Sequence, residues 1–225
     1  MPIEPSSSRW QLDLDRATPG DDLVGIGADL EPGTVLMAYR AGLFPMGVGE
    51  GGSEPIGWWS PDPRGVLLPG QVRISRSLRK SLGHFDIRID TAFSEVVQGC
   101  ADRSRQGSWI TPAITLAYTR LYELGWAHSV EAWRDGELFG GLYGLALGGL
   151  FAGESMYHRA TDASKCALVG LADLVFADRD PRRMIDVQWA TPHLVSLGIT
   201  AIPRTDYLAR LERALPVPVP SAFDG

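Results

Sequence analysis

The chain has 225 residues, an apolar content of 44% and a formal net charge of −6. A chain of this length can bury a sizeable core without disulfide bonds, and its two cysteines lie far apart and match no metal-binding spacing. The first ten residues contain no apolar segment of signal-peptide length, and no apolar run approaches the ~20 residues that cross a bilayer. These features exclude a disulfide-stapled domain and predict a cytoplasmic protein with no membrane partner.

The N-terminal quarter contains one predicted helix, followed by loops. Residues 28–46 favour a short helix that begins near Asp29, has Pro32 in its first turn and ends at Gly42. Residues 47–57 are glycine-rich and indicate a loop, and three prolines within residues 58–70 argue against a regular element there. The adjacent tryptophans at 58 and 59 either pack between domains, which is the more common role, or provide a stacking platform for a base.

From residue 64 onward, helix and strand patterns follow one another in a regular order. The pattern predicts helices at 75–83, 92–102, 111–125, 163–176, 191–198 and 205–215, and strands at 85–90, in three runs within 127–157, and at 184–189. Strand meanders flanked by helices are typical of an α+β fold. We place the domain boundary near residue 63, which gives a small N-terminal domain (1–63) and a larger domain (64–225).

Polar side chains stand at the ends of several otherwise apolar strands. Because side chains alternate along a strand, Glu154 and Met156 are expected on one face and Ser155 on the other. The same argument places Asp186 and Gln188 on one face, as it does the serine and glutamate at 129 and 131. A buried carboxylate is costly unless it is paired. These groups therefore either satisfy each other and the backbone or form a reactive site.

Residues 63–85 carry no acidic side chain, although the whole chain is acidic. Their basic side chains, His84 aside, are Arg64, Arg73, Arg76, Arg79 and Lys80. This segment predicts either a phosphate-binding face or a solvated helix surface. Elsewhere, the four histidines show no ligand spacing, and the chain has no Walker loop, no GxGxxG after a strand and no GxSxG turn. We therefore expect neither a metal nor a nucleotide cofactor.

Nearly the whole chain resembles the leucyl/phenylalanyl-tRNA–protein transferase family. The matching stretches occur in the family's order: LMAYRAGLFP, WWSPDPRGVL, ISRSL, SWIT, AHSVEAWRDGELFGGLYG, FAGESMYHRATDASKCAL, IDVQW, HLVSLG and IPRTDYLARL. The block that runs from GGLYG through FAGESM to ASK is the most specific. The resemblance implies a small N-terminal domain joined to an acyltransferase domain like those of the GNAT superfamily.

The resemblance also implies an activity. The family moves Leu, Phe or sometimes Met from the 3′ end of aminoacyl-tRNA to the N-terminal Arg or Lys of a protein, and the product carries a degradation signal. The reaction is aminolysis of an activated ester, so neither ATP nor a metal is needed. The expected partners are aminoacyl-tRNA and proteins or peptides that begin with Arg or Lys.

The same resemblance assigns the central residues of the site. Met156 and Leu142 are expected to line an adaptable apolar pocket for the aminoacyl side chain, with Glu154 at its polar rim. Asp186 and Gln188 match the family's D-x-Q pair. In that pair Gln188 contacts the attacking amine and Asp186 polarises Gln188, or the two only position the amine.

Further substrate contacts follow from the same match. Trp109 and Tyr118 are expected to hold the terminal adenosine, where stacking contributes ~1–3 kcal/mol. The remaining expected substrate contacts are Tyr39, Met46, Ser155 and Thr191, and the expected tRNA-backbone contacts are Arg73, Arg76, Arg79 and Lys80.

The chain departs from the usual family pattern at three positions. Met46 stands where Trp is frequent and Thr191 where Asn is usual. Asp162 replaces the usual Asn before ASK and is expected to cap the following helix.

Two other functions deserve comparison. An acetyl-CoA-dependent acetyltransferase of the same superfold usually has a Q/R-x-x-G-x-G/A loop, which this chain lacks. A non-catalytic binder of tRNA ends or degradation signals is the other, and the joint presence of Glu154, Asp186 and Gln188 argues against it.

Overall fold

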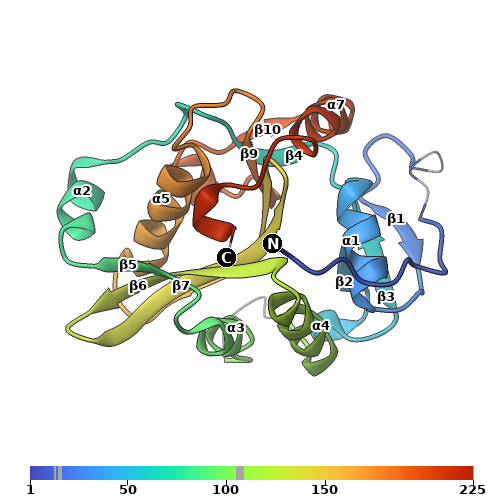
Figure 1. Cartoon of the computed structure of the whole chain (residues 1–225), viewed down its shortest axis with the longest axis horizontal. Helices are drawn as coiled ribbons and strands as arrows, with labels where there is room; N and C mark the ends of the chain where they lie inside the picture. The colour runs from blue at the N-terminus through green and yellow to red at the C-terminus, as the bar shows by residue number, and fades with distance from the viewer. Residues whose placement is uncertain (13, 15–16, 105–108, 225) are drawn as a thin grey trace.

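The computed structural model describes the whole chain except residues 13, 15–16, 105–108 and 225. Within the described residues there are seven α-helices and two β-sheets, one of three strands and one of seven. The three-stranded sheet lies at one end of the molecule beside the larger sheet and its helices (Figure 1). The predicted mixture of helices and strands is confirmed, while the GNAT-like assignment and the domain boundary near residue 63 stay predictions.

The smaller sheet comes entirely from the N-terminal quarter, so the expectation of one helix followed by loops in this part of the chain was wrong. Its strands are antiparallel in the order β1-β3-β2. The elements are β1 (Leu23–Ile26), α1 (Pro32–Arg40), β2 (Phe44–Gly47), the 3₁₀ turn η2 (Glu50–Gly52) and β3 (Ile56–Trp59). Trp58 is fully buried within this sheet, which fits the packing role, whereas Trp59 is half-buried.

The expectation that residues 58–70 hold no regular element was wrong. This segment ends β3 and contains β4 (Arg64–Leu67), an interior strand of the large sheet. Its three prolines lie between the two strands and after the second, so no proline occupies a hydrogen-bonded strand position.

The large sheet has the strand order β10-β4-β9-β8-β7-β6-β5. The strands after β4 are β5 (Asp86–Ile89), β6 (Ala127–Arg134), β7 (Glu137–Leu147), β8 (Leu150–His158), β9 (Met184–Gln188) and β10 (Thr200–Ile202). The helices are α2 (Arg76–Leu82), α3 (Phe93–Cys100), α4 (Pro112–Glu123), α5 (Ala163–Val175), α6 (Pro192–Val195) and α7 (Arg204–Ala214), and η3 (Ser221–Phe223) follows. Every predicted element after residue 64 is present, and β10 was not predicted.

Side-chain caps explain several of the helix starts. The hydroxyls of Ser75, Thr111 and Thr191 accept backbone N–H groups at the starts of α2, α4 and α6. The expected cap by Asp162 is wrong: this residue has a left-handed φ of 65° and makes no cap hydrogen bond. Its carboxylate is instead bound by Lys165 and Ser81.

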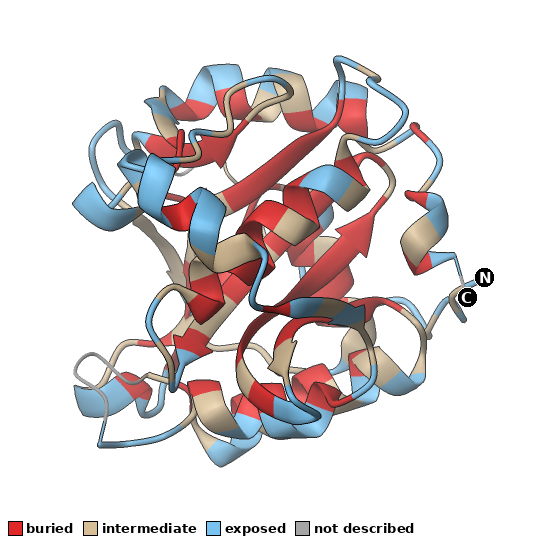
Figure 2. Ribbon diagram, turned by 90° about the vertical axis from the view of Figure 1, so that its left-hand side faces the viewer, coloured by how far each residue is buried: buried red, intermediate tan, exposed pale blue. Residues whose placement is uncertain are grey.

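Helices cover both faces of the large sheet. Helices α3 and α4 pack on one face, and α2 and α5 pack on the other (Figure 1). The central strands β6, β7 and β9 are mostly buried between these layers (Figure 2). In the described part of the chain, no helix is long and apolar enough to cross a membrane.

One strand pair in the large sheet differs from the rest. All neighbours are antiparallel except β8 and β9, which run parallel. Their pairing covers only Leu150–Ala152 against Met184–Asp186, although both strands continue further. The two strands therefore separate after Ala152 and Asp186, and this separation creates the space for a site.

Candidate active site

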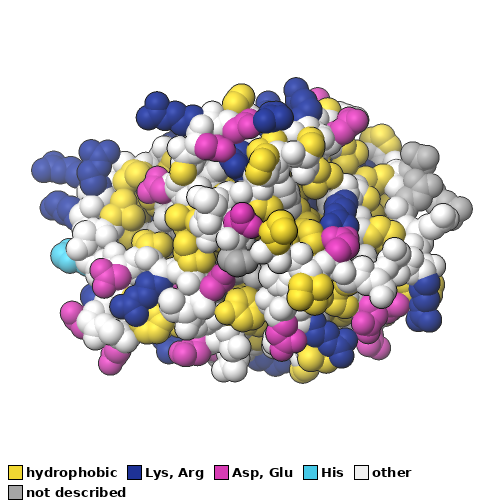
Figure 3. Space-filling model, viewed as in Figure 1, with side chains coloured by type: hydrophobic (Ala, Val, Ile, Leu, Met, Phe, Trp, Pro, Cys, Tyr) yellow, Lys and Arg dark blue, Asp and Glu magenta, His cyan; other side chains and the backbone are white. Residues whose placement is uncertain are grey.

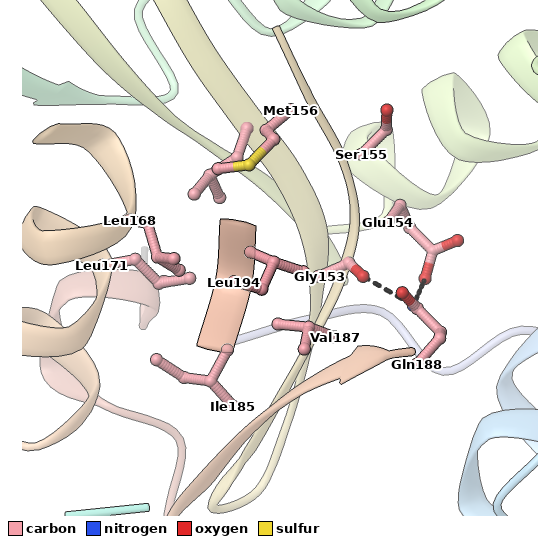
Figure 4. Close-up of a pocket in the computed structure, with 11 residues that line it drawn as sticks. Gly153, Glu154, Ser155, Met156, Leu168, Leu171, Ile185, Val187, Gln188 and Leu194 are labelled. Carbon is pink, nitrogen blue, oxygen red and sulfur yellow. Dashed lines mark hydrogen bonds between the residues drawn. The ribbon is translucent and has the colours of Figure 1, made fainter. Parts of the chain in front are cut away.

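A β-bulge sets the direction of Glu154. Tyr143 of β7 pairs with Ser155, but the next residue, Gly144, pairs with Gly153, so Glu154 is an extra residue in β8. The bulge breaks the alternation of faces. The expectation that Glu154 and Met156 share a face was therefore wrong: Met156 points toward α5, whereas Glu154 and Ser155 lie on the other side of the strand (Figure 4).

An apolar pocket occupies the space between β8 and β9. Its volume is about 100 Å³. Met156 and Leu142 form part of its wall, while their contact with an aminoacyl side chain stays a prediction. The apolar lining is completed by Leu168 and Leu171 of α5, Ile185 and Val187 of β9, and Leu194 of α6. Glu154 and Gln188 lie at its polar side, whereas the Ser155 hydroxyl points away from the apolar lining (Figure 4).

Glu154 is held by hydroxyl groups rather than by a cation. The hydroxyls of Tyr39 and Tyr118 each donate to one of its carboxylate oxygens, and the two hydroxyls lie 2.6 Å apart. Burial raises the pKa of Glu154 to about 7, and the hydrogen bonds from the two tyrosines oppose this rise. Burial and the nearby Glu154 charge raise the pKa of both phenols, which therefore stay protonated as donors.

Asp186 accepts hydrogen bonds from two side chains, of which one is charged. Arg64 donates from Nε and Nη2 to the two carboxylate oxygens at 2.9 and 2.7 Å, and both side chains are fully buried. The Tyr207 hydroxyl adds a third bond at 2.9 Å. Burial disfavours the charge on Arg64, but the nearby Asp186 outweighs this and raises the pKa of Arg64, so Arg64 stays charged.

Gln188 connects the two carboxylates. Its backbone N–H donates to Asp186 Oδ1 at 2.9 Å, in a backbone with a left-handed φ of 59°. Its side-chain Nε2 donates to Gly153 O at 2.5 Å and reaches Glu154 Oε1 at 3.4 Å (Figure 4). Asp186 thus fixes the backbone of Gln188, and the side-chain amide faces Glu154 across the gap between the strands.

Two family models cover most of the chain. The model described as leucyl/phenylalanyl-tRNA protein transferase matches residues 66–212, and the model of its N-terminal domain matches residues 28–62. The chain belongs to the leucyl/phenylalanyl-tRNA–protein transferase family.

Named relatives support the same assignment. A leucyl/phenylalanyl-tRNA–protein transferase of Azoarcus sp. (strain BH72) is 49% identical over 213 residues, which is 92% of this chain and 88% of the relative. The enzyme of the same name from Desulforapulum autotrophicum is 45% identical over 221 residues, or 96% and 94% of the two chains. The enzyme of this name from Solidesulfovibrio magneticus is 49% identical over 203 residues, or 88% and 80%.

Other expected family contacts lie around this centre. Tyr39 and Tyr118 are almost fully buried, so in this structure the Tyr118 ring has no face open to a base and its visible role is to bind Glu154. Met46 and Trp109 are both half-buried. Both lie near the turn η2, since Gly52 of this turn lies against the end of β2 and against the Trp109 backbone. Their role in adenosine binding stays a prediction.

The remaining expected residues lie further out. Thr191 is exposed and caps α6, which brings Leu194 to the pocket. The predicted tRNA contacts are all exposed on α2 or just before it: Arg73, Arg76, Arg79 and Lys80. Arg64, which the sequence grouped with them, is buried against Asp186 and does not belong to that surface.

Sequence reasoning missed Arg64 and Tyr207 as parts of the site. The only signal for Arg64 was its position directly before the apolar run GVLL. Tyr207 lies in a helix whose polar sequence gave no sign that its hydroxyl reaches β9. Across the described residues, no group of three His, Cys, Asp or Glu side chains could hold a metal ion.

Proposed function

We propose that this chain transfers Leu, Phe or Met from the 3′ end of aminoacyl-tRNA to proteins or peptides with N-terminal Arg or Lys. The main support is one arrangement: an apolar pocket whose polar side carries a buried carboxylate with a pKa near neutrality. The pocket suits the side chain of the donor, and the carboxylate suits the proton chemistry of an attacking amine.

The pocket favours large unbranched or γ-branched apolar side chains. An apolar cavity of roughly 150 Å³ holds a benzene molecule, so a partly open pocket of about 100 Å³ accepts a leucine side chain. A phenylalanine ring needs more room, which the flexible Met156 side chain can provide by changing rotamer.

The reaction joins the peptide nitrogen to the aminoacyl carbonyl carbon and breaks the bond to the ribose oxygen. One amine proton must leave, and the ribose oxygen must gain one. A free α-amine has a pKa of roughly 7.7–8, close to the value of about 7 for Glu154. Glu154 is thus matched to accept the amine proton and return it to the leaving oxygen.

Gln188 and Asp186 serve this step by position. The Gln188 amide borders the pocket beside Glu154, where its oxygen can accept a hydrogen bond from the amine. An amide is a poor base, so Gln188 orients the amine rather than removing its proton. Asp186, with Arg64 behind it, keeps the Gln188 backbone in an uncommon conformation.

The surface of α2 is suited to the tRNA backbone. Its basic side chains gather at the end of the molecule formed by this helix, away from the N-terminal sheet (Figure 3). Phosphate contacts of this kind position a nucleic acid without reading its sequence. The same proposal includes a cytoplasmic location, a role in marking acceptors for degradation and a GNAT-like origin of the large domain.

A direct test uses radiolabelled Leu-tRNA and two matched peptides, one beginning with Arg and the other with Ala, without added ATP or metal. Label transferred to the Arg peptide alone supports both the activity and the acceptor rule. Equal transfer to both peptides contradicts the acceptor rule. No transfer to either, with tRNA binding intact, supports a non-catalytic binder instead.

A further inference from the structure

Three elements that supply an apolar side chain to the pocket also supply a basic side chain next to it. The basic residues, here called the basic collar, are His158 on β8, Lys165 on α5 and His193 on α6. Each lies one to three residues from a pocket-lining residue, respectively Met156, Leu168 and Leu194. Spacings of two on a strand and three on a helix keep His158 and Lys165 on the same side of their elements as Met156 and Leu168, so these two lie beside the pocket. His193 directly precedes Leu194 in the short helix α6.

The members of the collar lie close enough to influence one another. Burial lowers the pKa of His193, the charges of Lys165 and His158 lower it further, and Asp162 opposes them. His158 Nδ1 lies 3.3 Å from the Ser164 hydroxyl at the start of α5. His158 and His193 are exposed, and the Lys165 side chain is about one-third exposed. The three basic side chains are therefore accessible to solvent, and His158 and Lys165 both bind residues at the start of α5.

Asp162 links the collar to the basic helix α2. Lys165 Nζ donates to Asp162 Oδ1 at 2.7 Å, and the Ser81 hydroxyl of α2 donates to Oδ2 at 2.9 Å. Helix α2 carries Arg76, Arg79 and Lys80 on its exposed surface. The collar thus lies between the pocket mouth and the surface that suits the tRNA backbone.

We propose that the basic collar binds the backbone phosphates of the single-stranded 3′ end of the donor tRNA. This rests on the proposed function. With the aminoacyl group in the pocket, the terminal ribose lies at its mouth, and the chain of phosphates must leave over the surrounding surface. Lys165 exchanges its contact with Asp162 for a phosphate oxygen, and the two histidines donate hydrogen bonds to the same strand. Helix α2 then holds the double-stranded stem.

Three leucyl donor substrates of increasing length test the pocket, the collar and helix α2 one after another. The first is 3′-O-leucyl-adenosine, which has no phosphate; the second is a leucylated CCA trinucleotide; the third is Leu-tRNA. The paired substitution Lys165→Met/His193→Gln is expected to lower kcat/KM about tenfold for the trinucleotide and for tRNA, and to leave the adenosine ester unchanged. Arg76→Gln/Lys80→Gln is expected to lower kcat/KM for tRNA only. Arg213→Gln, an exposed change on α7, is the matched control.

A second experiment removes a negative charge beside the collar instead of its positive charges. Asp162→Asn removes the carboxylate that competes with phosphate for Lys165 while keeping a partner for Ser81. We expect about threefold tighter binding of the unacylated CCA trinucleotide, measured by fluorescence anisotropy. In Lys165→Met/His193→Gln, the slope of log Kd against log salt is expected to fall by about 0.7 for each phosphate that the variant no longer binds.

The results separate this proposal from the proposed function. If the wild-type chain transfers leucine but the collar variant slows all three donors equally, or slows none, the collar does not bind phosphate. An unchanged salt slope leads to the same conclusion. If the wild-type chain transfers leucine from no donor, the proposed function fails, and the trinucleotide binding data still decide the role of the collar.

Discussion

Two buried glutamates of the same sheet have opposite environments. Glu131 on β6 accepts hydrogen bonds from four donors: the Thr91 and Ser129 hydroxyls, the Ala92 backbone and the Trp133 indole. Glu154 on β8 is bonded by two phenols and reached by one amide at 3.4 Å, and it lies in the wall of a pocket.

The two glutamates differ in how completely hydrogen-bond donors offset their burial. The four donors around Glu131 saturate its oxygens, two of them from groups close in sequence, and they tie β6 to the start of α3. The donors around Glu154 only partly offset its burial, so its pKa rises to about 7. A carboxylate with incomplete solvation and access to a pocket is suited to proton transfer.

The strongest test of this comparison replaces each glutamate with glutamine. Glu154→Gln is expected to lower kcat by about 10²–10⁴-fold because it removes the proton acceptor. The same substitution is expected to raise the stability of the folded protein above pH 7. The raised pKa of Glu154 contributes stability that is complete below the usual value of 4.5 and is lost as the pH rises through about 7. Urea unfolding at pH 8 is therefore expected to show the variant more stable than wild type by about 3 kcal/mol.

Glu131→Gln is the matched control. The amide NH₂ of the variant faces a donor that it cannot satisfy, which is expected to cost about 1–3 kcal/mol of stability. The kcat of the folded fraction should stay within twofold of wild type. Loss of kcat in Glu131→Gln, or full kcat in Glu154→Gln, would reverse the assignment of roles.

Asp186 is a third buried carboxylate, and two of its hydrogen bonds come from the charged guanidinium of Arg64. Asp186→Ala leaves Arg64 buried without a counterion, which is expected to cost about 3–5 kcal/mol of stability. We expect kcat to fall by about 10–100-fold, as for groups that orient a reactive residue, with tRNA affinity unchanged in a filter-binding assay. Tyr207→Phe removes one donor and no charge, so smaller losses are expected. Equal turnover in Asp186→Ala and wild type would remove Asp186 from the mechanism.

Local sequence signals predicted most of the large domain. Hydroxyl residues before Arg76, Pro112 and Pro192 mark helix starts, and the Asp135-Gly136 turn separates two strands. The short strands β1 and β2 were not predicted, and β3 and β4 were missed because the prolines around them were treated as breaks within them. Strand β10 has only three residues, too few for a pattern.

The site was predicted in composition but not in geometry. The D-x-Q pair and the polar end of β8 pointed to Asp186, Gln188 and Glu154, which the structure brings together, and their catalytic roles stay predictions. The face of Glu154 was predicted wrongly because a β-bulge depends on the pairing with β7, which one strand does not encode by its own alternation. The role of Arg64 depends on a contact with a residue 122 positions away, so no local pattern indicates it.

Met156 allows a test of donor selectivity, for which we expect a smaller effect than for the two carboxylates. Met156→Ala enlarges the pocket on the α5 side, so the preference for Leu or Phe over Val is expected to weaken by about tenfold, the usual value of one or two methylene groups. Competition assays with pairs of aminoacyl-tRNAs measure this ratio. Met156→Leu conserves volume and should keep the preference. An unchanged ratio in Met156→Ala would place donor selection elsewhere.

The hydroxyls around Glu154 give the finest test of the comparison. The hydrogen bond from Tyr39 lowers the pKa of Glu154 against the effect of burial, so Tyr39→Phe raises this pKa further. The acid limb of the kcat–pH profile is then expected to move to higher pH, with about tenfold slower turnover than wild type at pH 6 and little change at pH 9. The same peptide is used throughout, so its own amine titration contributes equally.

Tyr143→Phe is the control, because the Tyr143 hydroxyl is buried nearby without a hydrogen-bond partner among the described residues. An acid limb that moves to lower pH in Tyr39→Phe, or that moves equally in both variants, would show that Glu154 does not carry the proton.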